Sequence, residues 1–309
     1  MLKKSNILAL VGGGTYPKFS RNKITIYDDH GGLILRQIRF NSNVISVKIR
    51  TDSIIGVIED KIYIININTL ATIDIIDIDK INYSTYSISN FNNELFLAFV
   101  EPKNKGNVQI EKYIISSKKT NKDEKRIINA HESNVIFLVL NNEGTLLATA
   151  SEKGQYIRIF NISNGGLLAE LKRGKKSKIS SLTFEFKSEI IGYSSEAGKT
   201  YIYNINELKK LINNKKENEK STENNKKELL KKSSEAFKIK EKPFSKFKFE
   251  EGKNIIGFIE PKSVVILTSE AKFYKASYNV KSGKKCLLLE ESLIKIDNKW
   301  YNNIIINLF

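Results

Sequence analysis

The sequence predicts an all-β protein, specifically a propeller of four-stranded blades. Short runs of β-branched and aromatic residues recur along nearly the whole chain, separated by turns rich in Asn, Gly, Asp and Lys. Alternation of apolar and polar residues dominates over helical spacing. The runs group in fours, with a period of roughly 40 residues that is typical of propeller blades. We therefore expect one domain over residues 1–309, with about six four-stranded units, the first lacking its opening strand.

Each such run is interpreted as one strand of a blade. The tail Asn298–Phe309 is apolar enough for a closing strand, although it could instead leave an unpaired edge. In chain order, the expected strands lie at 6–11, 22–28, 33–40, 44–50, 54–59, 61–67, 70–76, 83–90, 95–100, 107–113, 125–128, 135–140, 146–150, 156–161, 167–172, 179–184, 189–194, 199–204, 244–249, 255–259, 263–268, 271–277 and 286–290.

The clearest unit runs from Ala130 to Leu171, with the sequence AHESNVIFLVLNNEGTLLATASEKGQYIRIFNISNGGLLAEL. It has a His before its first strand, a turn after that strand, small residues in the second strand, and Phe160-Asn161 closing the third. These features are those of a degenerate WD-type repeat, in which radial packing of four-stranded sheets shields most strand edges. The next unit, ISSLTFEFKSEIIGYSSEAGKTYIYNI, repeats the pattern.

Composition restricts the possible partners. The formal net charge is +17, which favours anionic partners such as phosphates, nucleic acid or an acidic membrane surface. The excess of Lys, Asn and Ile is partly what an A/T-rich coding bias produces, so only local clusters of charge are informative. Cys286 is the single cysteine, which excludes a disulfide framework and fits a reducing compartment. No run approaches the ~20 apolar residues of a spanning helix, so any membrane contact is expected to be peripheral.

Catalysis has little support in the sequence. There is no P-loop, no metal-ligand spacing and no Ser/His/Asp order with a nucleophile-elbow signature. The glycines of GGGTYPKF follow a strand without phosphate-loop spacing and are interpreted as a turn. The two histidines, His30 and His131, are too few for a His-rich metal site. We expect no enzyme activity, no cofactor and no metal.

Cations gather at one strand end, in LLAELKRGKKSKISSLTF. Adjacent residues of a strand point to opposite faces, so Lys172 and Arg173 should serve two separate anion sites, with Gly174 allowing the chain to turn. A solvated turn is the alternative. Hydroxyls and cations from neighbouring strands favour a phosphorylated headgroup instead; they are His131, Ser151, Lys153 and Arg158 before the turn, and Ser194, Ser195, Lys199 and Thr200 after it.

Four segments in this order resemble the PROPPIN or WIPI family, WD-repeat β-propellers that bind phosphoinositides in autophagy. They are SNILALVGGGTYPKFSRNKITIYDD, VISVKIRTDSIIGVIEDKIYI, AHESNVIFLVLNNEGTLLATASEKGQYIRIF and ELKRG. The family's Phe/Leu-Arg-Arg-Gly motif is matched by Leu171-Lys172-Arg173-Gly174. The resemblance implies a first site of Lys172 with His131, Ser151, Lys153 and Arg158. It implies a second site of Arg173 with Ser194, Ser195, Lys199 and Thr200.

The chain departs from the family pattern in three places. Lys172 replaces an arginine, which loses the bidentate fork. Gln155 stands where many members have a hydroxyl, and Tyr201-Ile202-Tyr203 replaces His-Ile-Phe, which loses an imidazole. These changes predict sites that are weaker, or retuned between mono- and bisphosphates. The family has seven blades, so the resemblance also implies that the first blade is missing.

Residues 205–242 form a Lys- and Glu-rich stretch that is too polar to pack and too long for an ordinary hairpin loop. It is either a low-complexity insertion or, as the resemblance implies, a membrane-contacting loop between two strands of a blade. Lysines near an anionic leaflet gain about 1 kcal/mol each. The expected contacts are Leu208, Leu211, Ile212, Lys215, Lys216, Lys226, Lys227, Leu229, Leu230, Lys231, Lys232 and Phe237.

The resemblance implies phosphatidylinositol 3-phosphate and 3,5-bisphosphate as ligands. It also implies recruitment of the autophagy lipid-transfer protein that PROPPINs bind. The expected protein is a cytoplasmic monomer, placed peripherally on autophagic, endosomal or vacuolar membranes. The alternative is a WD-repeat protein-interaction scaffold without lipid specificity. Nucleic-acid binding ranks low because the lysine run lacks aromatic stacking residues.

Overall fold

The structure is a computed structural model. It describes residues 6–13, 16–79, 84–89, 94–115, 120–153, 155–173, 178–205, 243–259, 262–279, 286–293 and 304–305. Within its strands, only the backbone is described for Thr120, Asn121, Asp123, Lys172, Leu293, Ile304 and Ile305.

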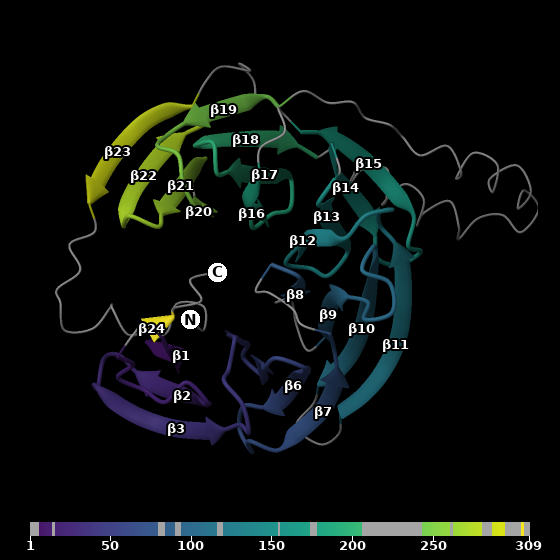
Figure 1. Ribbon diagram of the computed structural model, residues 1–309, viewed down its shortest axis with the longest axis vertical. Coiled ribbons are helices and arrows are strands. Elements are labelled where there is room, and N and C mark those ends of the chain that lie inside the picture. The colour runs from purple at the N-terminus through teal and green to yellow at the C-terminus, as the bar shows by residue number, and fades with distance from the viewer. Residues whose placement is uncertain are drawn as a thin grey trace, which may run out of the picture.

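The described residues form six antiparallel sheets of four strands, arranged around a centre as propeller blades (Figure 1). We number the blades in chain order. Blade 1 holds β24 (Ile304–Ile305), β1 (Ile7–Gly12), β2 (Lys23–Asp28) and β3 (Leu33–Arg39). Blade 2 holds β4 (Ser46–Ile49), β5 (Ser53–Val57), β6 (Lys61–Asn66) and β7 (Thr72–Asp77). Blade 3 holds β8 (Tyr86–Ile88), β9 (Glu94–Val100), β10 (Asn107–Ile115) and β11 (Thr120–Asn129).

The remaining blades follow the same order, with the innermost strand first. Blade 4 holds β12 (Val135–Leu140), β13 (Leu146–Ser151), β14 (Tyr156–Asn161) and β15 (Leu167–Lys172). Blade 5 holds β16 (Ile179–Phe184), β17 (Ile190–Ser195), β18 (Lys199–Asn204) and β19 (Ser245–Lys248). Blade 6 holds β20 (Asn254–Ile259), β21 (Ser263–Thr268), β22 (Lys272–Ser277) and β23 (Leu287–Leu293). The all-β propeller of about six blades that the sequence predicted is confirmed.

The core lies between blades, because both faces of the inner strands are covered. Every residue of β13 is buried. Leu146, Ala148 and Ala150 pack toward blade 5, and Leu147 packs toward blade 3. The small side chains of β13 allow the neighbouring sheet to approach closely. Hydrophobic clusters of the described residues join blades 1 and 2, 2 and 3, 3 and 4, 4 and 5, and 5 and 6.

Blade 1 is completed by the C-terminal tail. Within the expected closing segment Asn298–Phe309, the pair Ile304–Ile305 forms β24 and pairs with β1, with Val11 opposite Ile305. This tail strand occupies the innermost position of the sheet, which the other blades fill with their own first strand. The tail therefore supplies the fourth strand of blade 1.

The outer strand of blade 3 is longer than the sequence predicted. We expected a strand at 125–128, whereas β11 runs from Thr120 to Asn129. The polar residues of this strand find partners on the neighbouring strands: Lys122 Nζ lies 2.9 Å from a carboxylate oxygen of Glu111 and 3.1 Å from one of Asp74. The pattern of apolar alternation underestimates the length of such a strand, because polar side chains within it form ion pairs with neighbouring strands.

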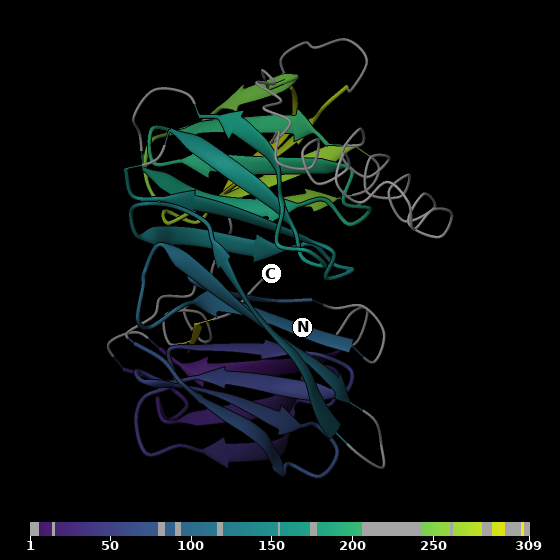
Figure 2. The same ribbon diagram turned by 90° about the vertical axis from the view of Figure 1, so that its right-hand side faces the viewer.

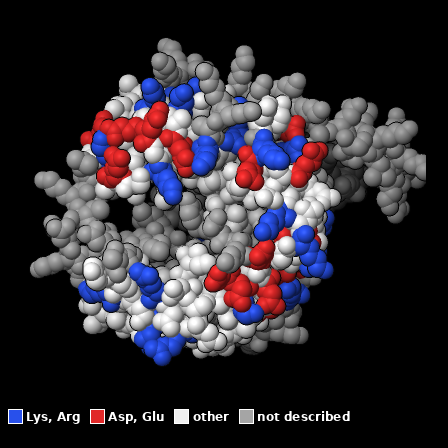
Figure 3. All heavy atoms as spheres, viewed as in Figure 1, with Lys and Arg blue, Asp and Glu red and all other residues white. Residues whose placement is uncertain are grey.

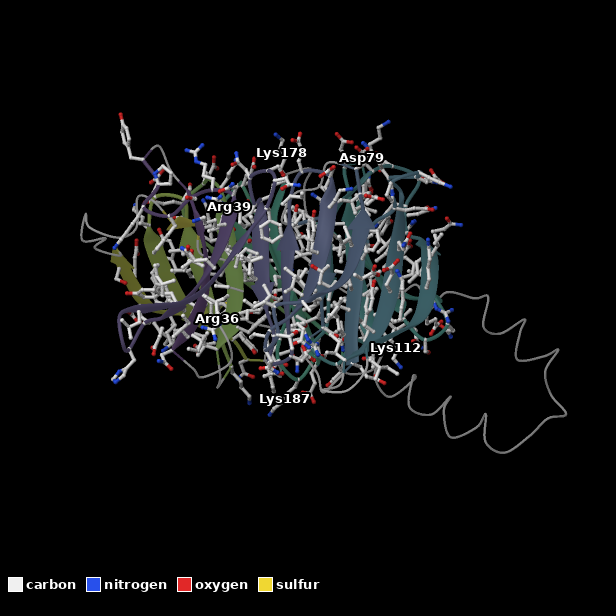
Figure 4. All side chains as sticks on the ribbon, turned by 90° about the horizontal axis from the view of Figure 1, so that it is seen from below. Arg36, Arg39, Asp79, Lys112, Lys178 and Lys187 are labelled. Atoms are coloured by element: carbon white, nitrogen blue, oxygen red, sulfur yellow. The ribbon has the colours of Figure 1, made fainter. Side chains whose placement is uncertain are left out.

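The disc has two faces, which carry different turns. Asp79 and Lys178, in connections between blades, lie on the face that we call the upper face, and Lys112 and Lys187 lie on the opposite, lower face (Figure 4). The side view shows strands of neighbouring blades lying one above another across the disc (Figure 2). Each strand therefore has one end at the upper face and the other at the lower face.

Candidate functional site

The cationic motif lies where β15 ends at the upper face. The register pairs Lys172 with Tyr156 and Glu170 with Arg158. The backbone N–H of Arg173 then donates to the carbonyl of Gln155 at 2.7 Å, which fixes the chain at the first residue after the strand. The side chain of Lys172 and all of Gly174 lie outside the described residues.

The two faces of β15 point to different neighbouring blades. Ala169 and Leu171 pack in the cluster between blades 4 and 5. Glu170 lies on the other face, where its carboxylate pairs with Arg158. The alternation on which the two-site hypothesis depends is therefore present in this strand.

The first group of site residues lies on the blade 3 side. Arg158 Nε donates to Glu170 Oε1 at 2.8 Å, and Arg158 Nη1 donates to the carbonyl of Ala130 at 2.8 Å. His131 follows Ala130, and its Nε2 lies 3.0 Å from Thr149 Oγ1, within hydrogen-bond distance. The structure thus brings His131 and Arg158 together, and it adds Glu170 as an internal counterion to the guanidinium.

His131 is neutral at physiological pH. Burial lowers the pKa of its imidazole to about 4, and the positive charge of Arg158 contributes to this lowering. The imidazole therefore offers one N–H donor or one lone pair to a ligand and adds no positive charge. The positive charge described beside this imidazole is the guanidinium of Arg158.

Two further residues of the first group lie nearby along the same strands. Ser151 is buried at the end of β13, opposite Val135 and two positions after Thr149, so it shares the face of Thr149. Lys153 is exposed in the following turn, and its backbone N–H donates to Ser133 Oγ at 3.4 Å. The lysine can therefore reach an anion at the rim, whereas the serine hydroxyl lies deeper.

The second group lies between blades 4 and 5. Arg173 is half-buried, and burial lowers the pKa of its guanidinium while the nearby Tyr193 hydroxyl opposes that shift. Ser195 and Lys199 lie opposite each other at the ends of β17 and β18, and Ser195 Oγ donates to the Lys199 carbonyl at 3.3 Å. These two residues share the face of Tyr193, so the structure brings them to the side of Arg173.

Stacked tyrosines lie on the same face of blade 5 as Ser195 and Lys199. The ring of Tyr193 lies 5.0 Å from that of Tyr201 and 6.3 Å from that of Tyr203, centroid to centroid. Tyr201 and Tyr203 belong to the cluster between blades 4 and 5. Burial, with Tyr193 close by, raises the pKa of Tyr203, so its hydroxyl stays protonated. Tyr193, a member of this stack, is an electrostatic neighbour of the Arg173 guanidinium.

Ser194 and Thr200 lie on the opposite face of blade 5. They are paired across β17 and β18, in line with Gly192 and Ile202. A Cβ on Gly192 would meet the ring of Phe258 of blade 6 at 2.9 Å, which shows where this face points. Both hydroxyls are fully buried and have no hydrogen-bond partner within the described part of the chain. The structure does not bring these two predicted residues together with Arg173.

Sequence reasoning missed several side chains of the site. Thr149 and Glu170 complete the first group, and Tyr193 lies beside Arg173 in the second. Alternation could have identified Glu170, because it stands two positions before Lys172 in one strand. Tyr193 gave no such signal, because only the packing of blade 5 on blade 4 brings it near Arg173.

The lysine-rich stretch is attached far from the cationic turn of the same blade. Its expected membrane contacts, from Leu208 to Phe237, all lie outside the described residues. The stretch leaves β18 at Asn204 and returns into β19 at Ser245, whereas Lys199 is at the other end of β18. A six-residue strand is roughly 17–20 Å long, so the attachment and the site lie at opposite faces of the disc rim.

Charge is not uniform over the surface. On the face shown in Figure 3, basic and acidic side chains are interspersed over the described surface instead of forming one basic field. No helix of the described segments has the length and hydropathy for crossing a bilayer. The described residues also contain no group of three or more His, Cys, Asp and Glu placed to hold a metal ion. Local clusters are therefore more informative than the net charge.

Comparison with known sequences identifies relatives over most of the chain. The PROPPIN family model matches residues 5–231. Autophagy-related protein 18e of Arabidopsis thaliana is 30% identical over 207 residues, which are 66% of this chain and 53% of that protein. Autophagy-related protein 21 of Schizosaccharomyces pombe is 25% identical over 295 residues, which are 94% of this chain and 84% of that protein. The chain thus spans about half the length of the first relative.

Solved structures share the fold. Hsv2 of Kluyveromyces lactis superposes with a TM-score of 0.70 and 17% identity, over 95% of this chain and 85% of that one. KlAtg21, solved in complex with the coiled coil of AgAtg16, gives a TM-score of 0.71 and 20% identity, over 95% and 83%. At this identity the likeness concerns the propeller architecture.

Proposed function

Because the chain belongs to the PROPPIN family, we propose that it is a phosphoinositide-binding peripheral membrane scaffold of autophagy or endolysosomal traffic. The proposed ligands are phosphatidylinositol 3-phosphate and phosphatidylinositol 3,5-bisphosphate. PROPPIN propellers are not known as enzymes, and the expectation that this chain is not one agrees with its family. The protein would act by docking on a membrane and recruiting partners.

The environment of Arg173 is the observation that carries the proposal. Arg173 is half-buried near Tyr193, which shares a face of blade 5 with Ser195 and Lys199. An arginine can donate two parallel hydrogen bonds to a phosphate, and partial burial strengthens such charged bonds. A phosphate at the rim between blades 4 and 5 would meet this fork, a lysine and a hydroxyl together.

The first group supports a second headgroup site. Arg158 is held by Glu170 and by the Ala130 carbonyl, and neither contact uses Nη2. Lys172, His131, Ser151 and Lys153 would add charge and hydrogen-bonding groups around it. Gly174 would let the chain turn between the two sites.

The protein would bind the membrane through two kinds of contact, the headgroup sites and the stretch 205–242. The stretch 205–242 would add lysines and short apolar clusters against the leaflet, which raises the effective concentration of the headgroup sites. The protein would be a cytoplasmic monomer that lies peripherally on autophagic, endosomal or vacuolar membranes. It would recruit an autophagy lipid-transfer protein.

A protein-interaction scaffold without lipid specificity is the second candidate. KlAtg21, which has the same fold, was solved with the coiled coil of AgAtg16. A propeller of this type can therefore present a surface to another protein. Such a scaffold would show no preference among anionic lipids at physiological salt.

Vesicle flotation separates the two candidates. We expect the protein to float with vesicles containing phosphatidylinositol 3-phosphate more than with vesicles of equal charge made with phosphatidylserine. The double change Lys172→Thr with Arg173→Thr should lower binding at least about tenfold, because each charged hydrogen bond contributes about 1.5–3 kcal/mol. The matched control is Lys23→Thr with Arg39→Thr, a cationic pair facing each other across β2 and β3 of blade 1. Unchanged flotation of the Lys172 and Arg173 variant would eliminate the headgroup proposal.

A further inference from the structure

The outer strand of blade 5 presents two lysines on the side of Arg173. In β19, Lys246 lies opposite Tyr201 and Lys248 lies opposite Lys199. Cross-strand partners point to the same face, with Cβ atoms about 4.5–5.5 Å apart. Lys246 Nζ lies 5.7 Å from the centre of the Tyr201 ring, which confirms the side on which its ammonium lies.

The residue between the two lysines gives an independent check of this direction. Phe247 packs with Phe249 and Tyr274 in a cluster shared with blade 6, and it also contacts the cluster of Ile202 and Ile256. Because neighbouring residues of a strand point to opposite faces, Lys246 and Lys248 face blade 4. Both lysines are exposed, so an anion can approach them from solvent.

Lys199 and Lys248 form a cross-strand pair of like charges. They are the first residue of the third strand and the last residue of the fourth. In blade 2 the same two positions hold Lys61 and Asp77, which form an ion pair at 2.5 Å. Like charges directly opposite are destabilising, and within the described residues neither Lys199 nor Lys248 has an ion-pair partner.

Blade 1 provides a useful contrast. It also has cations at these positions, Lys23 and Arg39, and Lys23 Nζ donates to Gln37 Oε1 at 3.4 Å. In blade 5 the like-charge pair of Lys199 and Lys248 lies on the side of Arg173. Blade 5 combines the like-charge pair with that arginine and with a second lysine, Lys246, over an aromatic ring.

We propose that Lys246 and Lys248, together with Lys199, form a subsite for an additional phosphate of the headgroup that Arg173 holds. This inference rests on the proposed function and extends it. The first phosphate takes the guanidinium fork, and the lysines along β18 and β19 attract a second phosphate on the same inositol ring. Tyr201 supports the Lys246 side chain without neutralising it. The subsite therefore gives the protein a preference for the 3,5-bisphosphate over the 3-phosphate.

The test compares two phosphoinositides at equal total membrane charge. Vesicles contain phosphatidylinositol 3-phosphate, phosphatidylinositol 3,5-bisphosphate, or phosphatidylserine alone, and binding is titrated at physiological salt. Changing Lys246→Gln with Lys248→Gln should weaken binding to the bisphosphate about tenfold, since each lysine near an anionic headgroup contributes about a fivefold factor at most. Binding to the monophosphate should fall less than about twofold.

A charge reversal at one of these lysines provides a second variant for comparison with the double glutamine variant. Lys248→Asp reproduces in blade 5 the Lys61 and Asp77 pair of blade 2, so the fold should be retained, as a circular-dichroism melt would show. The preference for the bisphosphate should disappear in this variant. Changing Lys23→Gln with Arg39→Gln removes the corresponding pair of blade 1 and should change binding to both lipids less than about twofold.

The outcomes separate this inference from the function on which it rests. Equal losses on both phosphoinositides and on phosphatidylserine would overturn the subsite, because they indicate general attraction to the membrane. Unchanged selectivity in both lysine variants would overturn it as well. If the unmodified protein binds neither phosphoinositide better than phosphatidylserine, the proposed function itself fails.

Discussion

The two sides of the β15 turn differ in how their cations are partnered. On the blade 3 side, Arg158 is paired with Glu170, and neutral His131 is within hydrogen-bond distance of Thr149. On the blade 5 side, Arg173 lies near Tyr193, and Lys199 faces Lys248. On the first side, the guanidinium of Arg158 is already paired with a carboxylate. The second side is strongly cationic within the part of the chain that the structure describes.

This difference indicates different roles for the two sides. A guanidinium held by a carboxylate and a carbonyl keeps a fixed orientation but has lost much of its net attraction for a distant anion. On the second side, Lys199 and Lys248 face each other and have no ion-pair partner among the described residues, so an anionic ligand would relieve their mutual repulsion. The first side would therefore orient a headgroup, and the second would supply most of the attraction.

The largest effect should come from removing the clamp on the second side. Arg173→Gln keeps a planar amide but loses the charge and the fork, so binding to vesicles with phosphatidylinositol 3-phosphate should fall about tenfold or more. Lys172→Gln, the matched change one residue earlier, should cost about fivefold at most, because a lysine attracts a phosphate only as a point charge. Flotation titrations of both variants measure the difference. A larger loss for Lys172→Gln would reverse the roles assigned to the two sides.

An intermediate effect is expected from the internal counterion of the first side. Glu170→Gln keeps a hydrogen-bond acceptor for Arg158 Nε but removes the negative charge, so phosphoinositide binding should tighten about threefold to fivefold. Glu170→Ala removes both the charge and the orientation, and it should gain less than the glutamine variant. The comparison of the two affinities isolates the positioning role of the carboxylate. If glutamine weakens binding as much as alanine, the charge of Glu170 does not compete with the ligand.

The smallest effect should come from the hydroxyls that face blade 6. Ser194→Ala with Thr200→Val should change vesicle binding less than about twofold, because both side chains lie on the face opposite Arg173. Both hydroxyls are buried without a partner in the described residues. Removing them should therefore leave the free energy of unfolding unchanged or raise it by about 1 kcal/mol. A melting curve and a flotation assay on the same sample provide both readouts. Loss of binding in this variant would return both residues to the headgroup site.

Period-two alternation sufficed to predict most of the strands and the separation of the β15 turn into two sides. The repeat from Ala130 to Leu171 yielded the strands of blade 4 with few changes, because its apolar residues alternate and its turns contain Gly and Asn. The prediction was poorest for β11, where polar residues such as Lys122 are stabilised by partners on other strands. A local pattern cannot report a partner that is distant in the sequence.

The sequence by itself determined that Lys172 and Arg173 occupy adjacent positions at the end of a strand, since a strand reverses its side-chain direction at every residue. It also determined the family, through motifs that span most of the chain. Tertiary structure decided which residues lie next to the cations on each side of this turn. Glu170 neutralises Arg158 because β15 pairs with β14 in one register, and Ser194 faces away from Arg173 because blade 5 packs on blade 6. Lys248 lies opposite Lys199 because β19 pairs with β18. The stretch 205–242 separates these two strands in the sequence, so no local pattern predicts the pairing.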